Sequence, residues 1–333
     1  MMIQPNSPLI YVALLLVFSL TGCESSSEPH RVLARNSHFV VVQTSKTDTY
    51  EELAKIFKGD ASFASVIARY NPAAADAGYA AIPLTPLNPS GVFTTGYQQV
   101  PVLCYHQFTD DTQTTNRMVV TEQAFARQMR YLHENGYQAI TLDTLYQFIE
   151  GQTELPDKAV VITVDDGYRS YLDVAVPILR QYNMPSTIFI YPDFIGGGVA
   201  LNWQDVELLA KSPLIDVQSH SKSHANLAFN NNIESSQQYQ QRLRQEVEVA
   251  QQSIEHVTGQ RSIHYFAYPY GTTSTELMTL LERNHYRLGF TVERGYNPAF
   301  SDPLLINRIM IYGGDSLSEF KTTLNTFVEI DLK

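Results

Sequence analysis

Two acidic residues followed by a glycine, and two histidines four positions apart, are the residues of this chain best suited to chemistry. Asp165, Asp166 and Gly167 follow a run of apolar residues, and His220 and His224 follow a shorter apolar run. Taken alone, an Asp-Asp-Gly favours a plain turn, and a histidine pair favours a surface or core position. Together, one carboxylate and two imidazoles predict an open three-ligand metal site with room for water, as hydrolytic zinc chemistry requires.

The segments that precede these residues are predicted to be strands that position them. Residues 159–164 are apolar and mostly β-branched, a pattern typical of a strand buried on both faces. Residues 214–217 predict a second, short strand, and the two histidines would face one point if residues 220–224 turned helical. Because α/β proteins keep their chemistry where strands end, we expect the carboxylates and imidazoles to lie there.

A third segment, residues 266–271, reads Phe-Ala-Tyr-Pro-Tyr-Gly. With the Asp-Asp-Gly and His-Ser-x-x-His segments it resembles the three motifs of the NodB-type polysaccharide deacetylases, carbohydrate esterase family 4, and the resemblance runs from about Val100 to the C-terminus. It implies a distorted (β/α) barrel of α/β class that removes N-acetyl groups from an N-acetylglucosamine polymer. It further implies Asp165 as the general base and a divalent metal, zinc before cobalt, nickel or iron, held by Asp166, His220 and His224.

The resemblance also implies roles for residues around this centre. Pro269 and Tyr270 would wall the acetyl pocket, and the backbone N–H of Tyr270 would donate to the oxyanion. Tyr168, just after the first motif, would contact the substrate. Trp203 is the single tryptophan of the chain and resembles a family tryptophan near the pocket, with a core anchor as the alternative.

The chain departs from the family pattern in two places. Most members use a histidine near the C-terminus as the acid, whereas the last histidine here is His285, in a segment typical of a helix end or surface. His106 instead ends an early apolar run, as in exopolysaccharide deacetylases that act on poly-N-acetylglucosamine, and is the candidate acid or a buried histidine that orients loops. Ala267 stands where many members carry an arginine near the base, and Arg308 is the candidate to hold the base, with a surface strand position as the alternative.

The N-terminus predicts export and a lipid anchor. Residues 9–20 are apolar but too short to span a bilayer comfortably, and they lead into Leu-Thr-Gly-Cys, which resembles a bacterial lipoprotein signal with Cys23 lipidated after cleavage. A signal anchor with an incidental cysteine is the alternative, because neither Lys nor Arg precedes the apolar stretch. The second cysteine, Cys104, leaves no framework of disulfides.

The remaining pattern divides the chain into five predicted parts. They are a signal peptide (1–22), a polar tether (23–37), a small α+β module (38–84), a linker (85–97) and the deacetylase domain (98–333). The order strand, helix, helix, strand in the module resembles a divergent LysM domain, a binder of N-acetylglucosamine polymers. Thr47-Asp48-Thr49 replaces the usual Gly-Asp-Thr of that family, so that a spacer is the alternative.

The charge balance of the chain limits the kinds of molecule that it could bind. The chain has 23 basic and 34 acidic residues and a formal net charge of −11, which argues against nucleic acid. The family resemblance and the N-terminal segment together imply an N-deacetylase anchored by lipid in the bacterial cell envelope, with the outer membrane favoured over the inner. Its substrate would be an exopolysaccharide, and an export machinery is a candidate partner. The alternatives are a peptidoglycan deacetylase, a carbohydrate O-acetyl esterase and a catalytically weak glycan-binding lipoprotein.

Overall fold

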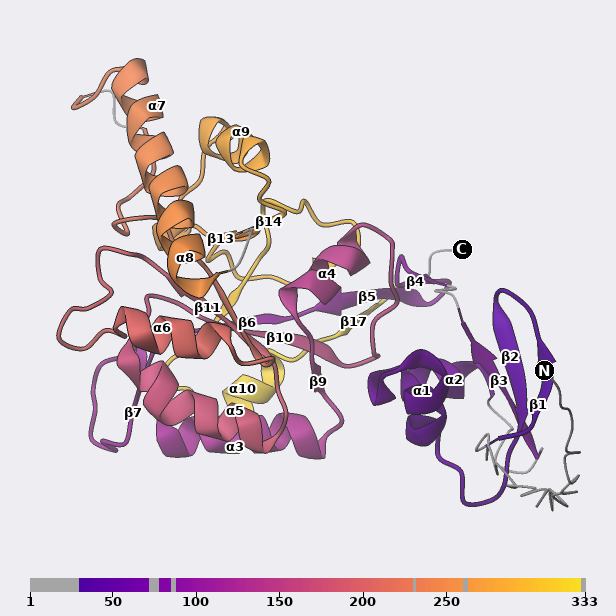
Figure 1. The fold of residues 1–333 in the computed structure, drawn as a ribbon. Helices are drawn as coiled ribbons and strands as arrows, with labels where there is room; N and C mark the ends of the chain where they lie inside the picture. Colours follow the sequence, from indigo (N-terminus) through magenta and orange to yellow (C-terminus); the bar gives the residue numbers. More distant parts are fainter. Residues whose placement is uncertain (1–29, 72–77, 85–87, 230–231, 260–262, 331–333) are drawn as a thin grey trace, which may run out of the picture.

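The computed structural model describes residues 30–71, 78–84, 88–229, 232–259 and 263–330. They form a small N-terminal module at one end of a larger α/β domain (Figure 1). Among these residues no helix is both long and apolar enough to cross a membrane. The predicted signal peptide and Cys23 lie outside the described residues.

The larger domain is built on a curled parallel sheet of eight strands. Backbone bonds join Gly289 and Thr291, at the last strand of one edge, to Pro303 and Ile306, which lead into the strand of the other edge. The sheet thus curls into a half-barrel, and the predicted (β/α) barrel is confirmed. In spatial order the strands are β14 (Leu288–Phe290), β13 (Tyr265–Ala267), β12 (Ile215–Ser219), β11 (Ser186–Ile190), β10 (Ala159–Val164), β6 (Val102–Tyr105) and β16 (Ile309–Met310), and β9 (Gln138–Ala139) pairs with the start of β10.

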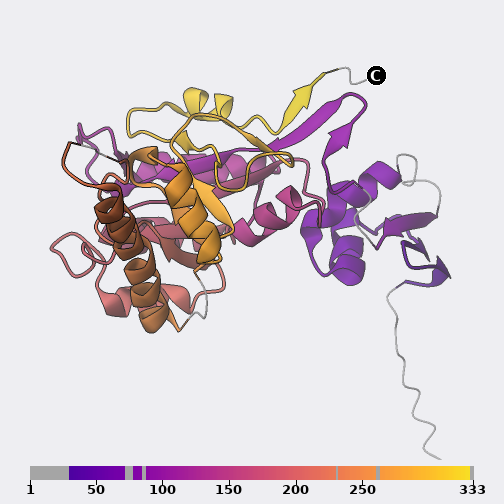
Figure 2. The same cartoon turned by 90° about the horizontal axis from the view of Figure 1, so that it is seen from above.

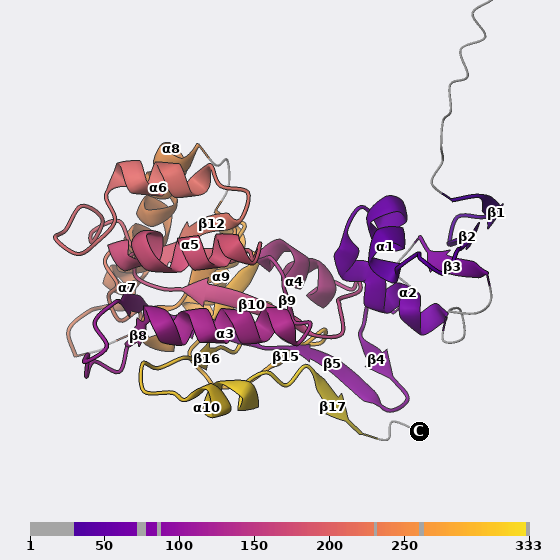
Figure 3. The ribbon, with the colours of Figure 1, turned by 90° about the horizontal axis from the view of Figure 1, so that it is seen from below.

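Helices cover the outer face of this sheet, and every residue of β10 is buried as a result. Polar residues stand at the N-caps of many of them, for example Thr121, Thr141 and Ser274, where the side chain accepts a backbone N–H of the first turn. Helices α3, α5 and α6 lie in a row along one side (Figure 3). The helices of this domain are α3 (Glu122–Glu134), α4 (Leu142–Ile149), α5 (Val176–Gln181), α6 (Trp203–Ala210), α7 (Ser236–Arg244), α8 (Ala250–Thr258), α9 (Thr275–Arg283) and α10 (Leu317–Thr322), with π-helical turns η2 (Tyr171–Ala175) and η3 (Gln245–Val249) and a 3₁₀ turn η4 (Pro269–Gly271).

Strand register brings the chemically suited residues to one end of the sheet. In the parallel ladder Val164 of β10 pairs with Tyr105 of β6, so that Asp165 and His106 follow neighbouring strands at the same level. Ser219 of β12 pairs with Ile190 of β11, which sets His220 on the same edge. The carboxyl ends of the strands therefore form the floor of a common site.

A second, antiparallel sheet stands where the sequence predicted a linker. It consists of β4 (Val92–Phe93), β5 (Gly96–Val100), β15 (Asn297–Pro298) and β17 (Phe327–Glu329). Gly96 has φ +143° and lies so close to Val328 that an added Cβ would meet its carbonyl oxygen. Residues 92–97 are thus not a free connection, because β4 pairs with β5, and Gly96 and Tyr97 pair with β17 near the end of the chain. Strands β7 (Gln107–Thr109) and β8 (Val119–Thr121) form a further short parallel pair.

The N-terminal module packs two helices on a three-stranded antiparallel sheet (Figure 2). Thr49 begins α1 with a capping box to Glu52. The strand β1 lies inside the segment predicted as a tether, so that the ordered module starts earlier than expected, because Val32, Ala34 and Arg35 pair with the next strand. The LysM likeness stays a prediction. Its elements are β1 (Val32–Arg35), β2 (Phe39–Gln43), α1 (Tyr50–Lys58), the 3₁₀ turn η1 (Ala61–Phe63), α2 (Ala64–Tyr70) and β3 (Tyr79–Pro83).

Candidate active site

A cavity of about 500 Å³ opens at the carboxyl ends of the strands. Residues from the loops after β6, β10, β12 and β13 line it, although these segments are far apart in the sequence. The structure therefore brings together most of the predicted site residues. Those that line the cavity are His106, Asp165, Asp166, Tyr168, His220, His224 and Tyr270.

Asp166, His220 and His224 form a cluster with the composition and spacing of a metal site. The Oδ1 atom of Asp166 lies 3.7 Å from Nε2 of His220 and 3.6 Å from Nε2 of His224. This oxygen is buried and has no hydrogen-bond partner among the described residues. Nδ1 of His220 lies 2.7 Å from the carbonyl oxygen of Ala267, which fixes the tautomer whose Nε2 lone pair faces the cluster. The donor set therefore fits a divalent metal ion such as zinc.

The two histidines converge without the helical turn that the sequence analysis considered for residues 220–224. The segment is irregular, and Ser221 and His224 have positive φ angles of 63° and 57°. The hydroxyl of Ser221 accepts the backbone N–H of His224. Spacing alone could not show that left-handed residues, and not a helix, bring the rings together.

Burial and the neighbouring charge give the ligands distinct protonation states. Burial, and then the charge of Asp165, raise the pKa of Asp166 to about 7. Burial lowers the pKa of His220 to about 4 and also lowers that of His224. Near neutral pH both imidazoles are therefore free of the proton that would block a metal, whereas Asp166 still holds one in part of the molecules.

Asp165 is clamped by a buried arginine. Nη1 and Nη2 of Arg308 donate to its two carboxylate oxygens, both at 2.7 Å, and Arg308 is fully buried. Burial alone would raise the pKa of Asp165, but the guanidinium outweighs it and holds the pKa well below the usual range. The structure thus places Arg308 against Asp165, the candidate base, and its burial excludes a surface position.

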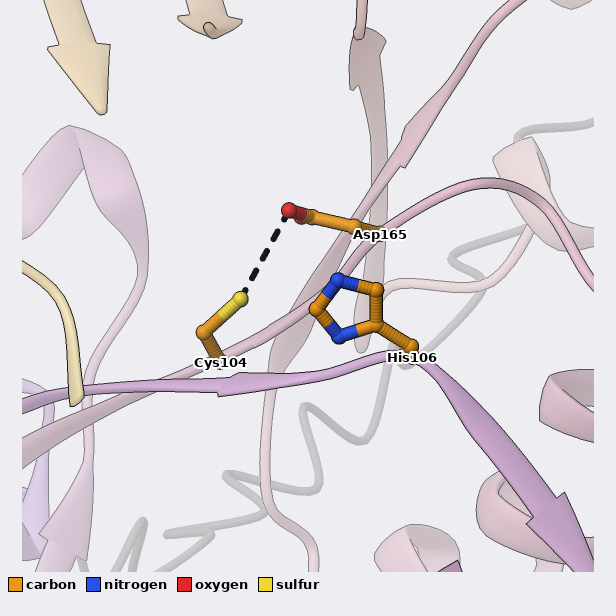
Figure 4. Close-up of side chains that lie close together, drawn as sticks. All are labelled: Cys104, His106 and Asp165. Carbon is orange, nitrogen blue, oxygen red and sulfur yellow. Dashed lines mark hydrogen bonds between the residues drawn. The ribbon is translucent and has the colours of Figure 1, made fainter. Parts of the chain in front are cut away.

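Two further side chains converge on Asp165 (Figure 4). Cys104 donates its S–H to Oδ2 over 3.5 Å, and His106 lies within 4.8 Å of both. Burial, above all, raises the pKa of the Cys104 thiol, so that it stays protonated and this second group of residues is a poor metal site. Burial also lowers the pKa of His106, while the Asp165 charge opposes this shift. His106 thus lies beside Asp165, the candidate base.

An aromatic wall stands beside the ligands. The ring of Tyr270 lies edge-on to His224, with centroids 4.7 Å apart, and its side chain is 63% exposed. Tyr191 contacts the other side of His224 and stacks on Phe194. The sequence analysis missed Tyr191 and Phe194. The apolar strand that ends at Ile190 could have pointed to them, because they follow its carboxyl end.

Pro269, Tyr168 and Trp203 take different positions. Pro269 is buried and begins the turn that carries Tyr270. Tyr168 lines the cavity and packs on Phe194. Trp203 begins α6 and packs, partly buried, against the core, which favours its alternative as an anchor.

The fold and this site define an α/β-barrel protein with a candidate hydrolytic metal centre. Residues 152–289 match the model of the family described as Polysaccharide deacetylase. The chain therefore contains a polysaccharide deacetylase domain, and the family resemblance seen in the sequence is confirmed.

Individual relatives agree with this assignment. The Bacillus subtilis (strain 168) protein YxkH is 27% identical over 222 residues, which cover 67% of this chain and 75% of YxkH. The poly-β-1,6-N-acetyl-D-glucosamine N-deacetylase of Escherichia coli (strain K12) is 26% identical over 263 residues, covering 68% of this chain but 38% of that protein. The solved Streptococcus pyogenes deacetylase PplD in complex with acetate has a TM-score of 0.61 at 23% identity, over 68% of this chain and 98% of its own, and supports the fold.

We expect Arg308 to be essential for both stability and the state of Asp165. Arg308→Gln leaves a buried carboxylate without its partner and lowers the free energy of unfolding by about 3–5 kcal/mol. Arg287, whose partly exposed ion pair with Asp143 spans 3.6 Å, provides the matched control, and Arg287→Gln lowers it by less than about 1 kcal/mol. Urea unfolding of both variants measures the difference, and equal losses would contradict the assigned role of the clamp.

We expect metal binding to release a proton from Asp166. Because the pKa of this carboxyl is raised to about 7, the affinity for zinc increases as the pH rises toward 7 and levels off above it. In the metal-free protein the same shift stabilises the fold below the ordinary value of 3.8, and this contribution is lost as the pH rises through about 7. Calorimetric titration in buffers of different ionisation enthalpy counts the protons, and an affinity that stays constant over this range would refute the assignment.

Proposed function

We propose that this protein removes N-acetyl groups from an N-acetylglucosamine polysaccharide of the cell envelope, and that its natural substrate is an exopolysaccharide of the poly-β-1,6-N-acetyl-D-glucosamine type. The proposal rests mainly on one observation: Arg308 holds the carboxylate of Asp165 ionised beside the cluster of Asp166, His220 and His224. The name of the Escherichia coli relative, a poly-β-1,6-N-acetyl-D-glucosamine N-deacetylase, supports the choice of polymer.

Asp166, His220 and His224 would hold the metal ion, with zinc favoured by the two imidazoles. When bound, a divalent ion supplies a Lewis acid for the acetamide carbonyl and lowers the pKa of water to about 7. Asp165 is positioned to accept the proton of the attacking water. Because Arg308 keeps the proton affinity of this carboxylate low, Asp165 passes the proton on readily.

His106 is the residue that would receive the proton from Asp165 and donate it to the departing amine. Its ring lies beside Asp165, and the lowered pKa leaves it neutral at pH 7 in the resting site. A proton that arrives through Asp165 makes it the acid for the departing amine. The backbone N–H of Tyr270 would donate to the oxyanion of the tetrahedral intermediate.

The N-terminal parts extend the proposal to location. Cys23 would carry a lipid that anchors the protein in the envelope, in the outer membrane before the inner, and the LysM-like module would hold the glycan near the site, beside an export machinery. The sequence before Cys23 and the element order of the module support this. Persistent fatty-acid labelling of Cys23→Ser in cells would contradict the anchor.

Acetate release tests the activity. The chain from His30 onward, which keeps β1, is expected to release acetate from β-1,6-linked N-acetylglucosamine oligomers after metal stripping and zinc reconstitution. Asp165→Asn, which retains the shape of the base, is expected to lose about 100-fold or more in kcat. Preferential release from O-acetylated sugars would identify an esterase, and preferential release from peptidoglycan would replace the proposed polymer. No release despite bound zinc would contradict the proposal.

His106→Asn tests the acid. A group that acts in the transition state affects kcat more than KM, so we expect a kcat lowered about 100-fold with KM nearly unchanged. His285→Asn is the matched control, because His285 is exposed and its φ of 63° suits asparagine. Near-normal turnover in a folded His106→Asn protein would leave His106 as a histidine that orients loops.

A further inference from the structure

A buried carboxylate from outside the cavity holds the loop between the two histidine ligands. Glu246 is 7% exposed, and its Oε2 accepts the backbone N–H groups of Lys222 at 3.0 Å and Ser223 at 2.9 Å. Its Oε1 accepts the hydroxyl of Ser223 at 2.6 Å. Both bonded residues lie between His220 and His224, so this carboxylate fixes the backbone that sets the spacing of the two rings.

The loop depends on such a partner because its own backbone is unfavourable. Ser221 and His224 both have positive φ angles, a conformation that residues with a Cβ adopt at a cost. Lys222 and Ser223 belong to neither a helix nor a strand, so that their N–H groups are not satisfied by regular structure. Glu246 accepts both N–H groups and stabilises the strained segment from the side.

A π-helical turn delivers Glu246 to this position. The turn η3 (Gln245–Val249) interrupts what is otherwise one long helix running from α7 to α8 (Figure 1). Both Glu246 and Val247 are buried there, so one residue packs in the core while its neighbour turns to the loop. Such turns inside helices often accompany functional sites.

The same loop is bonded to the aromatic wall. Nζ of Lys222 lies 2.8 and 2.7 Å from the two carboxylate oxygens of Asp193, and the Asp193 N–H donates to the Lys222 carbonyl. Asp193 lies between Tyr191, which contacts His224, and Phe194. The backbone that Glu246 holds therefore connects the metal ligands to the wall beside them.

We propose that Glu246 is a positioning residue of the active site. It holds the backbone of Lys222 and Ser223 so that the imidazoles of His220 and His224 converge on Asp166. Through the bonds between Lys222 and Asp193 it also keeps Tyr191 in place beside His224. The consequence for turnover rests on the proposed deacetylase function. The consequence for metal affinity rests on the geometry of the loop alone.

Metal affinity of the full-length protein tests this role. Chelator competition gives the zinc dissociation constant, and the visible absorption of the cobalt-substituted protein reports the ligand geometry. We expect Glu246→Ala to weaken zinc binding about 10- to 100-fold and to change the cobalt spectrum, as loss of an outer partner of metal ligands does. Glu246→Gln keeps one of the two acceptor oxygens, and Ser223→Ala removes one hydrogen bond. Both variants are expected to lose less zinc affinity than Glu246→Ala. Glu248→Gln, on the same helical turn and partly exposed, is the matched control and keeps wild-type affinity.

A purely structural role would give another result. Wild-type zinc affinity and an unchanged cobalt spectrum in folded Glu246 variants, with a lowered thermal stability of the metal-free protein, would overturn the proposal. If Glu246→Ala does not fold, Glu246→Gln and Ser223→Ala decide by the same measurements. If the wild-type protein binds zinc but releases no acetate, the deacetylase function fails, whereas the comparison of affinities still decides the role of Glu246.

Discussion

The buried ion pair between Arg308 and Asp165 is the interaction on which the rest of the site depends. Arg308 precedes β16, in the segment that links the two edges of the curled sheet, and its Nε also donates to the carbonyl of Thr291. The pair therefore joins the end of β10 to the seam of the half-barrel. A charge buried this deeply is stable only with its partner in place, so the closure of the sheet and the ionised state of the base require one another.

Adjacent carboxylates acquire opposite properties from this arrangement. Asp165 faces Arg308 and stays ionised far below the usual pH, whereas Asp166, one residue on, has a pKa raised to about 7. Asp166 has a positive φ of 80°, and its Oδ1 lies 3.7 and 3.6 Å from Nε2 of His220 and His224. Two identical side chains in different surroundings thus suit two tasks, proton transfer and metal binding.

The sequence predicted the parts of this structure that depend on local pattern. The apolar run of β10 and the strand, helix, helix, strand order of the N-terminal module follow from neighbouring residues, and both are present. The contact of Arg308 with a carboxylate 143 positions away could be suggested by the family pattern alone, since no local signal encodes it. Residues 92–97 were predicted as linker because the strand that pairs with Gly96 and Tyr97, β17, comes from the end of the chain. Glu246 escaped notice because its burial depends on a π-helical turn that helical spacing conceals.

Backbone strain concentrates where the ligands converge. Among the described residues six other than glycine have positive φ, and four of these, Asp166, Ser221, His224 and Tyr270, lie in the motifs of the site. Each such residue destabilises the fold by about 1 kcal/mol or more. Glycine would relieve the strain but would remove a ligand, a hydroxyl bond or the wall of the cavity. The strain persists because the bonds of Ala267 to His220, of Ser221 to His224 and of Glu246 to the loop offset it. A site held this way keeps its ligands oriented before any metal or substrate arrives, so that reorganisation does not add to the barrier of the reaction.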